Sequence, residues 1–302
     1  MSGGVSCEVW IERDLNGCEI VVKQALPKLK VTADWRASPD RYEVEVRALE
    51  AARKLLGDHV APRVLWVDAI HHRFAMERID SRLRNWKDDL LKGQVNMTTA
   101  ARVGELLGLL HTRSANHPDY AIEFGNRQYF EELRIEPFFK RIAERNPDLA
   151  DAVSMAIAAL RRPGTALVHG DFSPKNLLVA GQDVVILDWE VAHWGNPRFD
   201  VAFCLTHLLL KAFRRGVDSL LYISMAHAFI FAYRPSGVGA VLDAELVRIL
   251  GCLGLARFEG DSPIDYLAEI DTSRIKPLFC EWIRHPQSDV ERALDVAQRW
   301  ES

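Results

Sequence analysis

The sequence predicts an α+β protein with a small β-rich lobe, residues 1–78, followed by a larger and mainly helical lobe, residues 79–302. Three observations lead to this expectation. The first quarter contains short runs of strand-like alternation around one helical stretch. Most of the remaining chain repeats its apolar residues with a helical period, and only one island, residues 165–190, returns to strand-like runs. No Gly/Ser-rich linker joins the two lobes, so the pattern does not indicate domains that tumble independently.

Composition places the chain among globular proteins whose partners are small molecules or other proteins. Of the 302 residues, 48% are hydrophobic and 26% are charged, which excludes a disordered or fibrous chain. The formal net charge of -4 provides no broad basic surface for nucleic acid or for an anionic membrane. The sequence leaves the oligomeric state open.

Cysteine usage and the N-terminal residues together predict a cytoplasmic location. The five cysteines form neither a C-x-x-C pair nor the spacing of a zinc site, so we expect buried free thiols in a reducing compartment. The first residues have neither the basic nor the apolar region of a signal peptide. No run approaches the roughly 18 apolar residues that a membrane helix needs.

Turn and capping residues define the expected elements of the first lobe. Two strand-like runs flank Leu15-Asn16-Gly17, a hairpin turn signal, and predict an antiparallel pair. Pro39-Asp40 opens a helix over residues 41–56, which a glycine then ends. Strands are expected again at residues 62–67 and 74–77.

The second lobe is expected to consist of two helical blocks separated by the strand island. The first block extends from Trp86 to Leu160, and the second from Asp200 to the C-terminus. Within the island, the pattern predicts a strand, a loop, a strand, a turn and a third strand.

The loop of this island carries the most informative residues of the chain. It has the sequence His169-Gly-Asp171-Phe-Ser-Pro-Lys-Asn176, and an apolar run leads from it to Asp188-Trp-Glu190. In kinases, a catalytic-loop Asp precedes a metal-binding Asn by five positions, and a second metal-binding Asp follows a strand further on. The short loop lets one carboxylate face a substrate hydroxyl while the Asn turns toward metal and phosphates. Each residue alone could be a loop cap or a strand-end polar group, but together they indicate a phosphoryl-transfer site.

These motifs resemble those of the aminoglycoside phosphotransferase and choline kinase superfamily, and the resemblance covers nearly the whole chain. The pattern HGDxxxxN is specific, and the segment GNPRFDVA at residues 195–202 resembles the one that follows the metal-binding residues in this family. The resemblance implies a protein-kinase-like fold with two lobes. Asp188-x-Glu190 and the run RYEVEVRAL are similar to the 5-methylthioribose kinase branch in particular. That branch usually lacks an asparagine at the position of Asn176, so the resemblance does not extend to its acceptor.

The first lobe offers a lysine and a glutamate that together could orient nucleotide phosphates. Lys23 lies in a strand-like run, at the place of the kinase lysine that reaches the α and β phosphates. Its expected partner is a Glu on the following helix, where Glu43 and Glu45 compete. Positions 43, 47, 50 and 54 form a fully charged face, whereas positions 45, 49, 52 and 56 are Glu, Leu, Ala and Leu. A carboxylate on the apolar face needs a partner, so we expect Glu45 to pair with Lys23.

The resemblance implies further nucleotide contacts in the first lobe. Gly3, Gly4 and Ser6 resemble the glycine-rich loop whose amides hold phosphates. Only two residues precede this loop, so the strand that leads into it in the family is missing, and we expect residues 1 to about 6 to be mobile or displaced from the phosphate site without ligand. We further expect this chain to bind ATP weakly compared with a version extended upstream.

The connection between the lobes and several charged residues complete the set of candidates. Met76, Glu77 and Ile79 fall where the backbone of a kinase bonds the adenine edge, and an edge strand leaving the sheet would have the same pattern. Lys175 could reach a γ-phosphate or remain in solvent. Other residues have mainly structural interpretations: His111 as a satisfied buried histidine, and His169 and Asp200 as supports of the catalytic loop. The acidic residues could either line a pocket for a cationic substrate or form a solvated face: Glu259, Asp261, Asp265 and Glu269.

We therefore interpret the chain as a small-molecule kinase. MgATP would lie between the lobes, with GTP left open as the nucleotide. Asn176 and Asp188 would hold the metal, Glu190 could act through a second metal or a water, and Asp171 would orient a substrate hydroxyl or accept its proton. The main alternative is a nucleotide-binding pseudokinase, which the intact acidic residues disfavour. The acceptor stays open among aminoglycosides, amino alcohols, methylthio-sugars and other hydroxylated metabolites.

Overall fold

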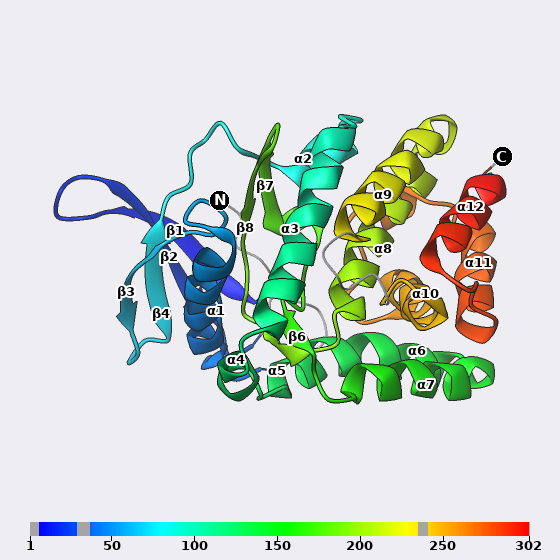
Figure 1. Ribbon diagram of the computed structural model, residues 1–302, viewed down its shortest axis with the longest axis horizontal. Helices are drawn as coiled ribbons and strands as arrows, with labels where there is room; N and C mark the ends of the chain where they lie inside the picture. Colours follow the sequence, from blue (N-terminus) through cyan, green and yellow to red (C-terminus); the bar gives the residue numbers. More distant parts are fainter. Residues whose placement is uncertain (1–5, 29–36, 235–240, 302) are drawn as a thin grey trace.

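The computed structural model describes residues 6–28, 37–234 and 241–301. A small antiparallel sheet with one helix forms the N-terminal part, and a larger, mainly helical part follows (Figure 1). The expected α+β class is therefore confirmed. The boundary between the parts lies in the connection after residue 77, and the division at residues 78 and 79 stays a prediction.

The N-terminal sheet has four strands in the order β1-β2-β4-β3. Their bounds are Cys7–Arg13 for β1, Glu19–Ala25 for β2, Val64–Asp68 for β3 and Arg73–Glu77 for β4. The expected hairpin around residues 15–17 joins β1 to β2, and Lys23 pairs with Val9 on one side and Phe74 on the other. Ile20 and Val22 pack on one face of the sheet, so the alternation of β2 places Lys23 on the opposite face.

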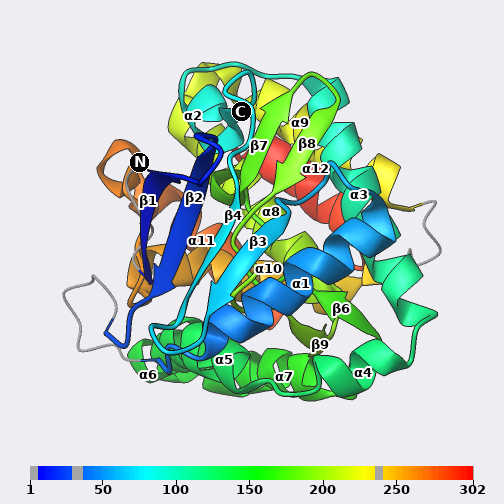
Figure 2. The ribbon, with the colours of Figure 1, turned by 90° about the vertical axis from the view of Figure 1, so that its left-hand side faces the viewer.

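Helix α1, Arg41–Leu56, packs across this sheet, as Figure 2 shows. Its limits agree with the sequence prediction, and Gly57 ends it at a φ of 110°. Glu45 and Leu49 are each 1% exposed, whereas Glu43 is exposed. The apolar stripe of the sequence is thus the buried face of the helix.

The strand island forms two short sheets beside the helices. β6, Ala166–Val168, pairs with β9, His193–Gly195, while β7, Leu177–Ala180, and β8, Asp183–Ile186, form a hairpin that β5, Arg84–Asn85, extends. In Figure 1 this hairpin lies between the N-terminal sheet and the helical part. The loop from His169 to Asn176 joins β6 to β7, so it opens toward the boundary between the two parts.

The helical part packs around a single apolar core. In this core α3 packs against α9, and α10 packs against both α8 and α11. The main helices are α2 (Trp86–Leu91), α3 (Met97–Ala115), α4 (Asp119–Glu123), α5 (Gln128–Phe130), a π-helical segment (Glu131–Lys140), α6 (Arg141–Arg145), α7 (Ala150–Arg161), α8 (Arg198–Arg215), α9 (Ser219–Tyr233), α10 (Ala244–Glu259), α11 (Thr272–Arg284) and α12 (Val290–Glu301). None of the described helices has the length and apolar character needed to span a membrane.

The cysteines follow the expectation with one exception. All five are free thiols, and Cys7, Cys204, Cys252 and Cys280 are buried. Cys18 is exposed, so the prediction of a buried thiol is wrong there. It lies in the turn between β1 and β2, whose residues 15–19 are exposed.

Candidate active site

A cavity of about 290 Å³ lies where the N-terminal part meets the strand island and the helices. Ser6 contributes to its lining from the N-terminal side, and Asp171, Lys175, Asp188 and Glu190 contribute from the strand island. Residues from the helical part complete the wall. The cavity therefore collects charged side chains from segments far apart in the sequence.

The loop from His169 to Asn176 is held by hydrogen bonds from its backbone to one buried carboxylate. Asp200, on α8, accepts a bond from the amide of His169 at 2.6 Å and from that of Gly170 at 2.8 Å. His169 bonds the carbonyl of Leu187 through Nε2 at 3.0 Å, and its Nδ1 accepts the amide of Asp171 at 3.1 Å. His169 and Asp200 are therefore positioning residues, as expected from the sequence.

His111 supports the same carboxylate from α3. Its Nε2 lies 3.3 Å from Asp200 and its Nδ1 lies 3.0 Å from the hydroxyl of Tyr233. The ring is fully buried, so both nitrogens have partners inside the core. The interpretation of His111 as a satisfied buried histidine is confirmed.

Gly170 allows the loop to turn in a conformation that other residues rarely adopt. Its φ is +78°, and a Cβ at this position would meet the carbonyl oxygen of Val191 at 2.5 Å. Gly181 has a similar φ of +62°, but a Cβ there would have no neighbouring atom within 4 Å, so it serves as a matched control.

We expect Gly181→Ala to lower the free energy of unfolding by about 1 kcal/mol, through backbone strain alone. Gly170→Ala combines that strain with the clash against Val191, and we expect a loss of about 2–4 kcal/mol. Denaturant unfolding of both variants measures the difference. Equal losses would show that the close approach to Val191 does not constrain this loop.

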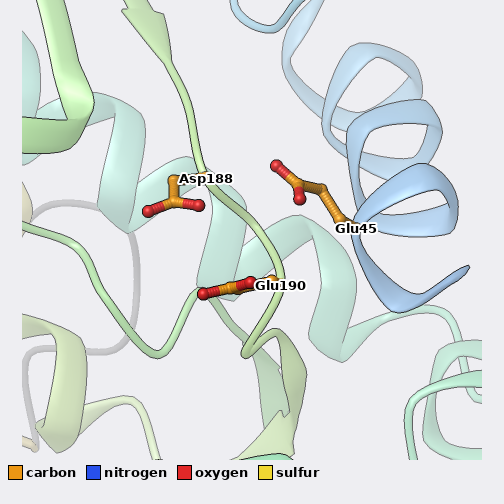
Figure 3. A group of neighbouring side chains, drawn as sticks. All are labelled: Glu45, Asp188 and Glu190. Carbon is orange, nitrogen blue, oxygen red and sulfur yellow. The ribbon is translucent and has the colours of Figure 1, made fainter. Parts of the chain in front are cut away.

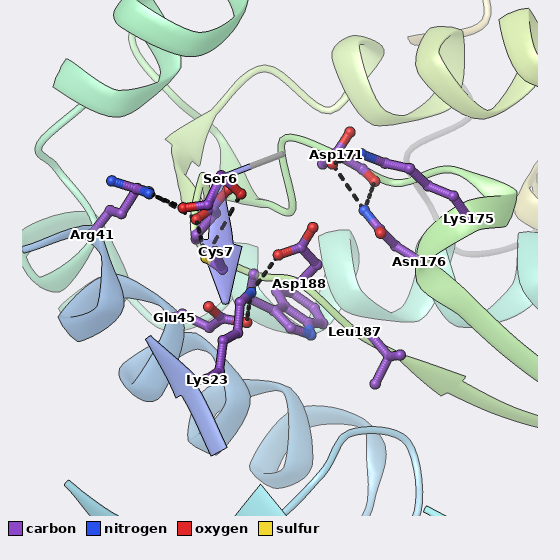
Figure 4. Close-up of polar contacts among 12 residues, drawn as sticks. Ser6, Cys7, Lys23, Arg41, Glu45, Asp171, Lys175, Asn176, Leu187 and Asp188 are labelled. Carbon is purple, nitrogen blue, oxygen red and sulfur yellow. Dashed lines mark hydrogen bonds and ion pairs between the residues drawn. The ribbon is translucent and has the colours of Figure 1, made fainter. Parts of the chain in front are cut away.

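Asp171 is almost fully buried, at 4% exposure, and is surrounded by donors. Its carboxylate lies 2.8 Å from Lys175 Nζ, 3.2 Å from Arg134 Nη2 and 2.9 Å from Asn176 Nδ2, and Figure 4 shows the Lys175 and Asn176 contacts. Burial by itself would raise the pKa of Asp171, but Lys175 and Arg134 outweigh it and hold the pKa below its ordinary value. Asp171 is therefore an ionised carboxylate at neutral pH. Lys175 lies beside it with its side chain 47% exposed.

Lys23 joins the buried Glu45 and the partly exposed Asp188, which come from different parts of the chain. Its Nζ lies 2.7 Å from Glu45 and 2.5 Å from Asp188 (Figure 4). Glu43 instead lies 3.7 Å from Arg47 on the exposed face. The choice of Glu45 over Glu43 as the partner of Lys23 is confirmed, because the apolar stripe does turn Glu45 toward the sheet.

The charges of this triad shift the pKa of each member. Burial would lower the pKa of Lys23, but Asp188 and Glu45 raise it well above its ordinary value. Burial raises the pKa of Glu45 to about 7, against the effect of Lys23. For Asp188, Lys23 and Lys175 overcome burial and lower the pKa well below its usual range. Asp188 thus stays charged, and its φ of 66° turns it out of the strand direction toward the cavity.

The two carboxylates of this triad and the neighbouring Glu190 offer oxygen atoms that could bind a divalent cation. Glu45, Asp188 and Glu190 each offer a carboxylate oxygen, and these oxygens lie within 4.8 Å of one another (Figure 3). Asn176 uses Nδ2 on Asp171, so its amide oxygen is the atom that could face a metal. Carboxylate and amide oxygens are the ligands that Mg²⁺ and Ca²⁺ take in proteins. The residues present therefore fit such an ion.

Comparison with known proteins agrees with this geometry. Residues 3–236 match the phosphotransferase enzyme family. The chain belongs to this family. It is 26% identical over 228 residues to methylthioribose kinase of Bacillus velezensis, covering 66% of this chain and 57% of that protein. It is 27% identical over 284 residues to methylthioribose kinase of Pectobacterium carotovorum, covering 85% of this chain and 67% of that protein.

Solved structures of phosphotransferases share the fold. An amicoumacin kinase in complex with AMP-PNP, Ca²⁺ and Ami has a TM-score of 0.60 at 13% identity, over 95% of this chain and 88% of that one. The expected protein-kinase-like fold is confirmed by this likeness. The chain spans between 53% and 67% of the length of three curated relatives that it matches.

Some of the predicted nucleotide contacts stay predictions. Gly3 and Gly4 lie outside the described residues. Ser6 is 7% exposed and lines the cavity, and its carbonyl accepts a bond from Arg41, so the expected displacement of the loop does not extend to Ser6. Met76, Glu77 and Ile79 lie at or just after the end of β4 and do not line the cavity, so their role in adenine binding stays a prediction.

Sequence reasoning missed Arg41, which connects the two parts of the chain. Its Nε lies 2.8 Å from Glu190, and its Nη2 donates to the carbonyls of Ser6 and Leu26. Arg41 is fully buried and lies one helical turn before Glu45, on the same face of α1. The face argument that selected Glu45 could have found it. Its partner Glu190 could not be inferred, because 149 residues separate the two.

The acidic run of residues 259–269 does not form a cationic-substrate pocket. Glu259 pairs with Lys276, Asp261 with Arg141, Asp265 with Lys87 and Glu269 with Arg214. Only Asp265 among these four lines the cavity. Most of the run is therefore an ion-paired surface.

Proposed function

We propose that this protein is a kinase that transfers the γ-phosphate of ATP to a hydroxyl group of a small molecule. The observation that carries the proposal is the ionised, buried Asp171 in the wall of a cavity that it shares with Asp188, Lys175 and Glu190. A carboxylate in this setting can accept a hydrogen bond from an incoming hydroxyl. Family membership and the spacing of the HGDxxxxN motif support the same conclusion.

In the proposed reaction, the protein mainly positions groups and compensates charge. Lys23, itself fixed by Glu45, binds the nucleotide phosphates, and Asp188 with the amide oxygen of Asn176 holds Mg²⁺. Glu190 provides a further oxygen, either directly or through water. A divalent cation bound there neutralises charge on the phosphate oxygens.

Asp171 orients the acceptor for in-line attack on the γ-phosphate. Its lowered pKa keeps it ionised, so that it can accept a hydrogen bond, and makes it a weak base, so it takes up the hydroxyl proton only as the new P–O bond forms. Lys175, 2.8 Å away, adds a positive charge beside the path of the transferred group. Arg134 holds the other carboxylate oxygen from the π-helical segment.

The test is a phosphorus NMR assay with purified protein, Mg²⁺ and ATP or GTP. We expect a new phosphomonoester signal together with the nucleoside diphosphate when a suitable hydroxylated metabolite is added. 5-Methylthioribose is the first acceptor to test, because the curated relatives are named methylthioribose kinases.

A pseudokinase would give a different result in this assay. It would bind the nucleotide, which calorimetry with AMP-PNP detects. It would not form a phosphomonoester from any of the hydroxylated metabolites tested. That outcome would contradict the proposed transfer. The parallel assays with ATP and GTP also decide which nucleotide the protein uses.

A further inference from the structure

The helical part contributes one wall of the cavity that the proposed transfer does not use. We call it the helical wall and define it by five residues from α8, α10 and the segment after α10: Phe203, His207, Lys211, Arg257 and Tyr266. Two of the five are cations, and both are buried: Lys211 is 1% exposed and Arg257 is 5% exposed. The same cavity contains Asp171, so a molecule bound against this wall would share the space with the catalytic carboxylate.

The helical wall carries positive side chains and no carboxylate among its five residues. Each carboxylate that lines the cavity already has a cationic partner: Asp171 has Lys175, Asp188 has Lys23, Glu190 has Arg41 and Asp265 has Lys87. Within residues 6–28, 37–234 and 241–301, neither Lys211 nor Arg257 forms an ion pair. A buried cation without a counter-ion is unfavourable, so an anion that enters the cavity has a natural site here.

In the part of the chain that the structure describes, the hydrogen-bond partners of Lys211 are neutral groups. Its Nζ lies 3.1 Å from the carbonyl of His207 and 3.2 Å from the hydroxyl of Tyr266, whose ring centroid is 5.2 Å away. Burial lowers the pKa of Lys211 to about 7, and the neighbouring Lys87 acts in the same direction. An ammonium group in this state gains more from an added anion than a lysine in solvent does.

Arg257 has unused hydrogen-bonding capacity. Its Nη1 bonds the carbonyl of Ser262 at 3.2 Å, and its guanidinium lies over the rings of Phe138 at 4.2 Å and Phe203 at 5.0 Å. Among the described residues, its buried Nε and Nη2 find no hydrogen-bond partner, and neither does Nε2 of His207. Such groups are rare in folded proteins. Nε and Nη2 share one edge of the guanidinium, and this edge matches two oxygens of a carboxylate or phosphate.

We propose that the acceptor carries an oxyanion group, a carboxylate or a phosphate, which binds at Lys211 and Arg257 while its hydroxyl group meets Asp171. This inference rests on the proposed kinase function and specifies its substrate class. It separates the hydroxylated acids and phosphorylated alcohols from the amino alcohols and aminoglycosides, whose positive charges the two cations would repel. A cavity of about 290 Å³ suits a small molecule of this kind.

Calorimetric titration in the presence of AMP-PNP and Mg²⁺ tests the inference without requiring turnover. The panel contains hydroxy acids and sugar phosphates with three to six carbons, such as glycerate, glycerol 3-phosphate, gluconate and glucose 6-phosphate. Each is compared with its neutral polyol or sugar and its amino counterpart, and 5-methylthioribose is included. We expect at least one anion to bind about tenfold more tightly than its neutral and cationic counterparts. The hydroxy-acid and phosphate arms identify which oxyanion is preferred.

Equal or tighter binding of the neutral or cationic compounds would overturn the inference, as would the absence of saturable binding by every anion. Neither result would affect the proposed kinase function, because AMP-PNP binding and phosphomonoester formation are measured separately. Conversely, if the protein bound the anion but did not bind AMP-PNP, the result would contradict the proposed kinase function and would not contradict the anion site.

Lys211→Met and Lys87→Met form a matched pair of variants. Both lysines line the cavity, but Lys87 already has Asp265 as its partner at 2.5 Å. We expect Lys211→Met to weaken binding of the preferred anion about tenfold or more and Lys87→Met to weaken it by no more than about threefold, with AMP-PNP affinity unchanged in both. Methionine fills a similar volume without a buried charge, so the Lys211 variant should fold. Undiminished anion binding by Lys211→Met would overturn the assignment.

The pH dependence provides a readout that a structural role of Lys211 would not change. Lys87 and Arg214 lower the pKa of Lys211 in addition to burial, and Cys204 and Asp265 raise it, which leaves it at about 7 before the anion binds. The side chain is charged below this pKa and neutral above it. With a carboxylate probe, which stays ionised throughout, affinity should therefore fall between about pH 6 and about pH 8.5. Lys211→Met should abolish this fall, and a flat profile in the wild type would contradict the proposal.

Discussion

Replacing Asp171 by Asn is expected to reduce kcat by roughly 10²- to 10⁴-fold, the usual contribution of a general base or hydroxyl-orienting group. Asparagine keeps the size of the side chain but loses the charge that attracts the acceptor hydroxyl and its proton. Lys23, Glu45 and Asp188 are unchanged, so affinity for MgATP should stay within a few-fold. Steady-state kinetics with an identified acceptor and calorimetry with AMP-PNP measure the two effects.

Asp183→Asn is the matched control for Asp171→Asn. Asp183 is an exposed carboxylate at the start of β8, where it lies 3.0 Å from Arg82, and it does not line the cavity. Its replacement should leave kcat within about twofold, because surface ion pairs contribute little. Near-full turnover by Asp171→Asn would disprove its catalytic assignment, and a parallel loss of nucleotide affinity would place Asp171 in the nucleotide site instead.

Replacing Asp188 by Asn is expected to weaken metal-dependent nucleotide binding by roughly 100-fold or more, about 3 kcal/mol of binding free energy. Asp188 combines a lowered pKa with a place in the cavity wall, so it is the carboxylate most able to hold the ion directly. Glu190 is held by Arg41 at 2.8 Å, which limits its freedom to approach a metal. We expect Glu190→Gln to weaken MgATP binding by no more than about tenfold.

The comparison is made by titrating ATP with and without Mg²⁺ into each variant. Asp188→Asn should bind ATP with Mg²⁺ about as weakly as the wild type binds it without Mg²⁺. Glutamine is preferred to alanine at position 190, because alanine would remove the hydrogen-bond acceptor of the buried Arg41 Nε as well as its counter-ion, and would destabilise the fold. Equal losses in the two variants would show that Glu190 coordinates the metal as directly as Asp188.

Local signals predicted the elements around the site well. Pro39-Asp40 and Gly57 define both ends of α1, and the apolar stripe of this helix was enough to choose Glu45 over Glu43. The HGDxxxxN spacing likewise located the catalytic loop, because a short loop between two strands fixes where its residues lie. In each case the information lies within about one helical turn or one loop.

The residues that sequence reasoning missed depend on packing between distant segments. The place of Arg41 in the site depends on its contact with Glu190, which lies 149 positions away in the sequence. Arg134 approaches Asp171 from a π-helical segment, and the altered period of this segment changes which residues face inward. The buried cations Lys211 and Arg257 look like ordinary charges of two amphipathic helices in the sequence. Their burial becomes apparent only when α8 and α10 are packed together.

The position of Lys23 has a practical consequence for the choice of an inactive reference protein. Its ammonium group is the counter-ion of Glu45 and Asp188, which come from different parts of the chain. Substituting Lys23 would leave the buried Glu45 and the partly exposed Asp188 as neighbouring carboxylates without this counter-ion, so the variant would lose stability as well as nucleotide binding. A cell that expressed the Lys23 variant would contain less folded protein. A lost phenotype would then combine the effect of a lower protein level with that of the lost activity. Asp171→Asn retains this internal counter-ion and is therefore the cleaner inactive form.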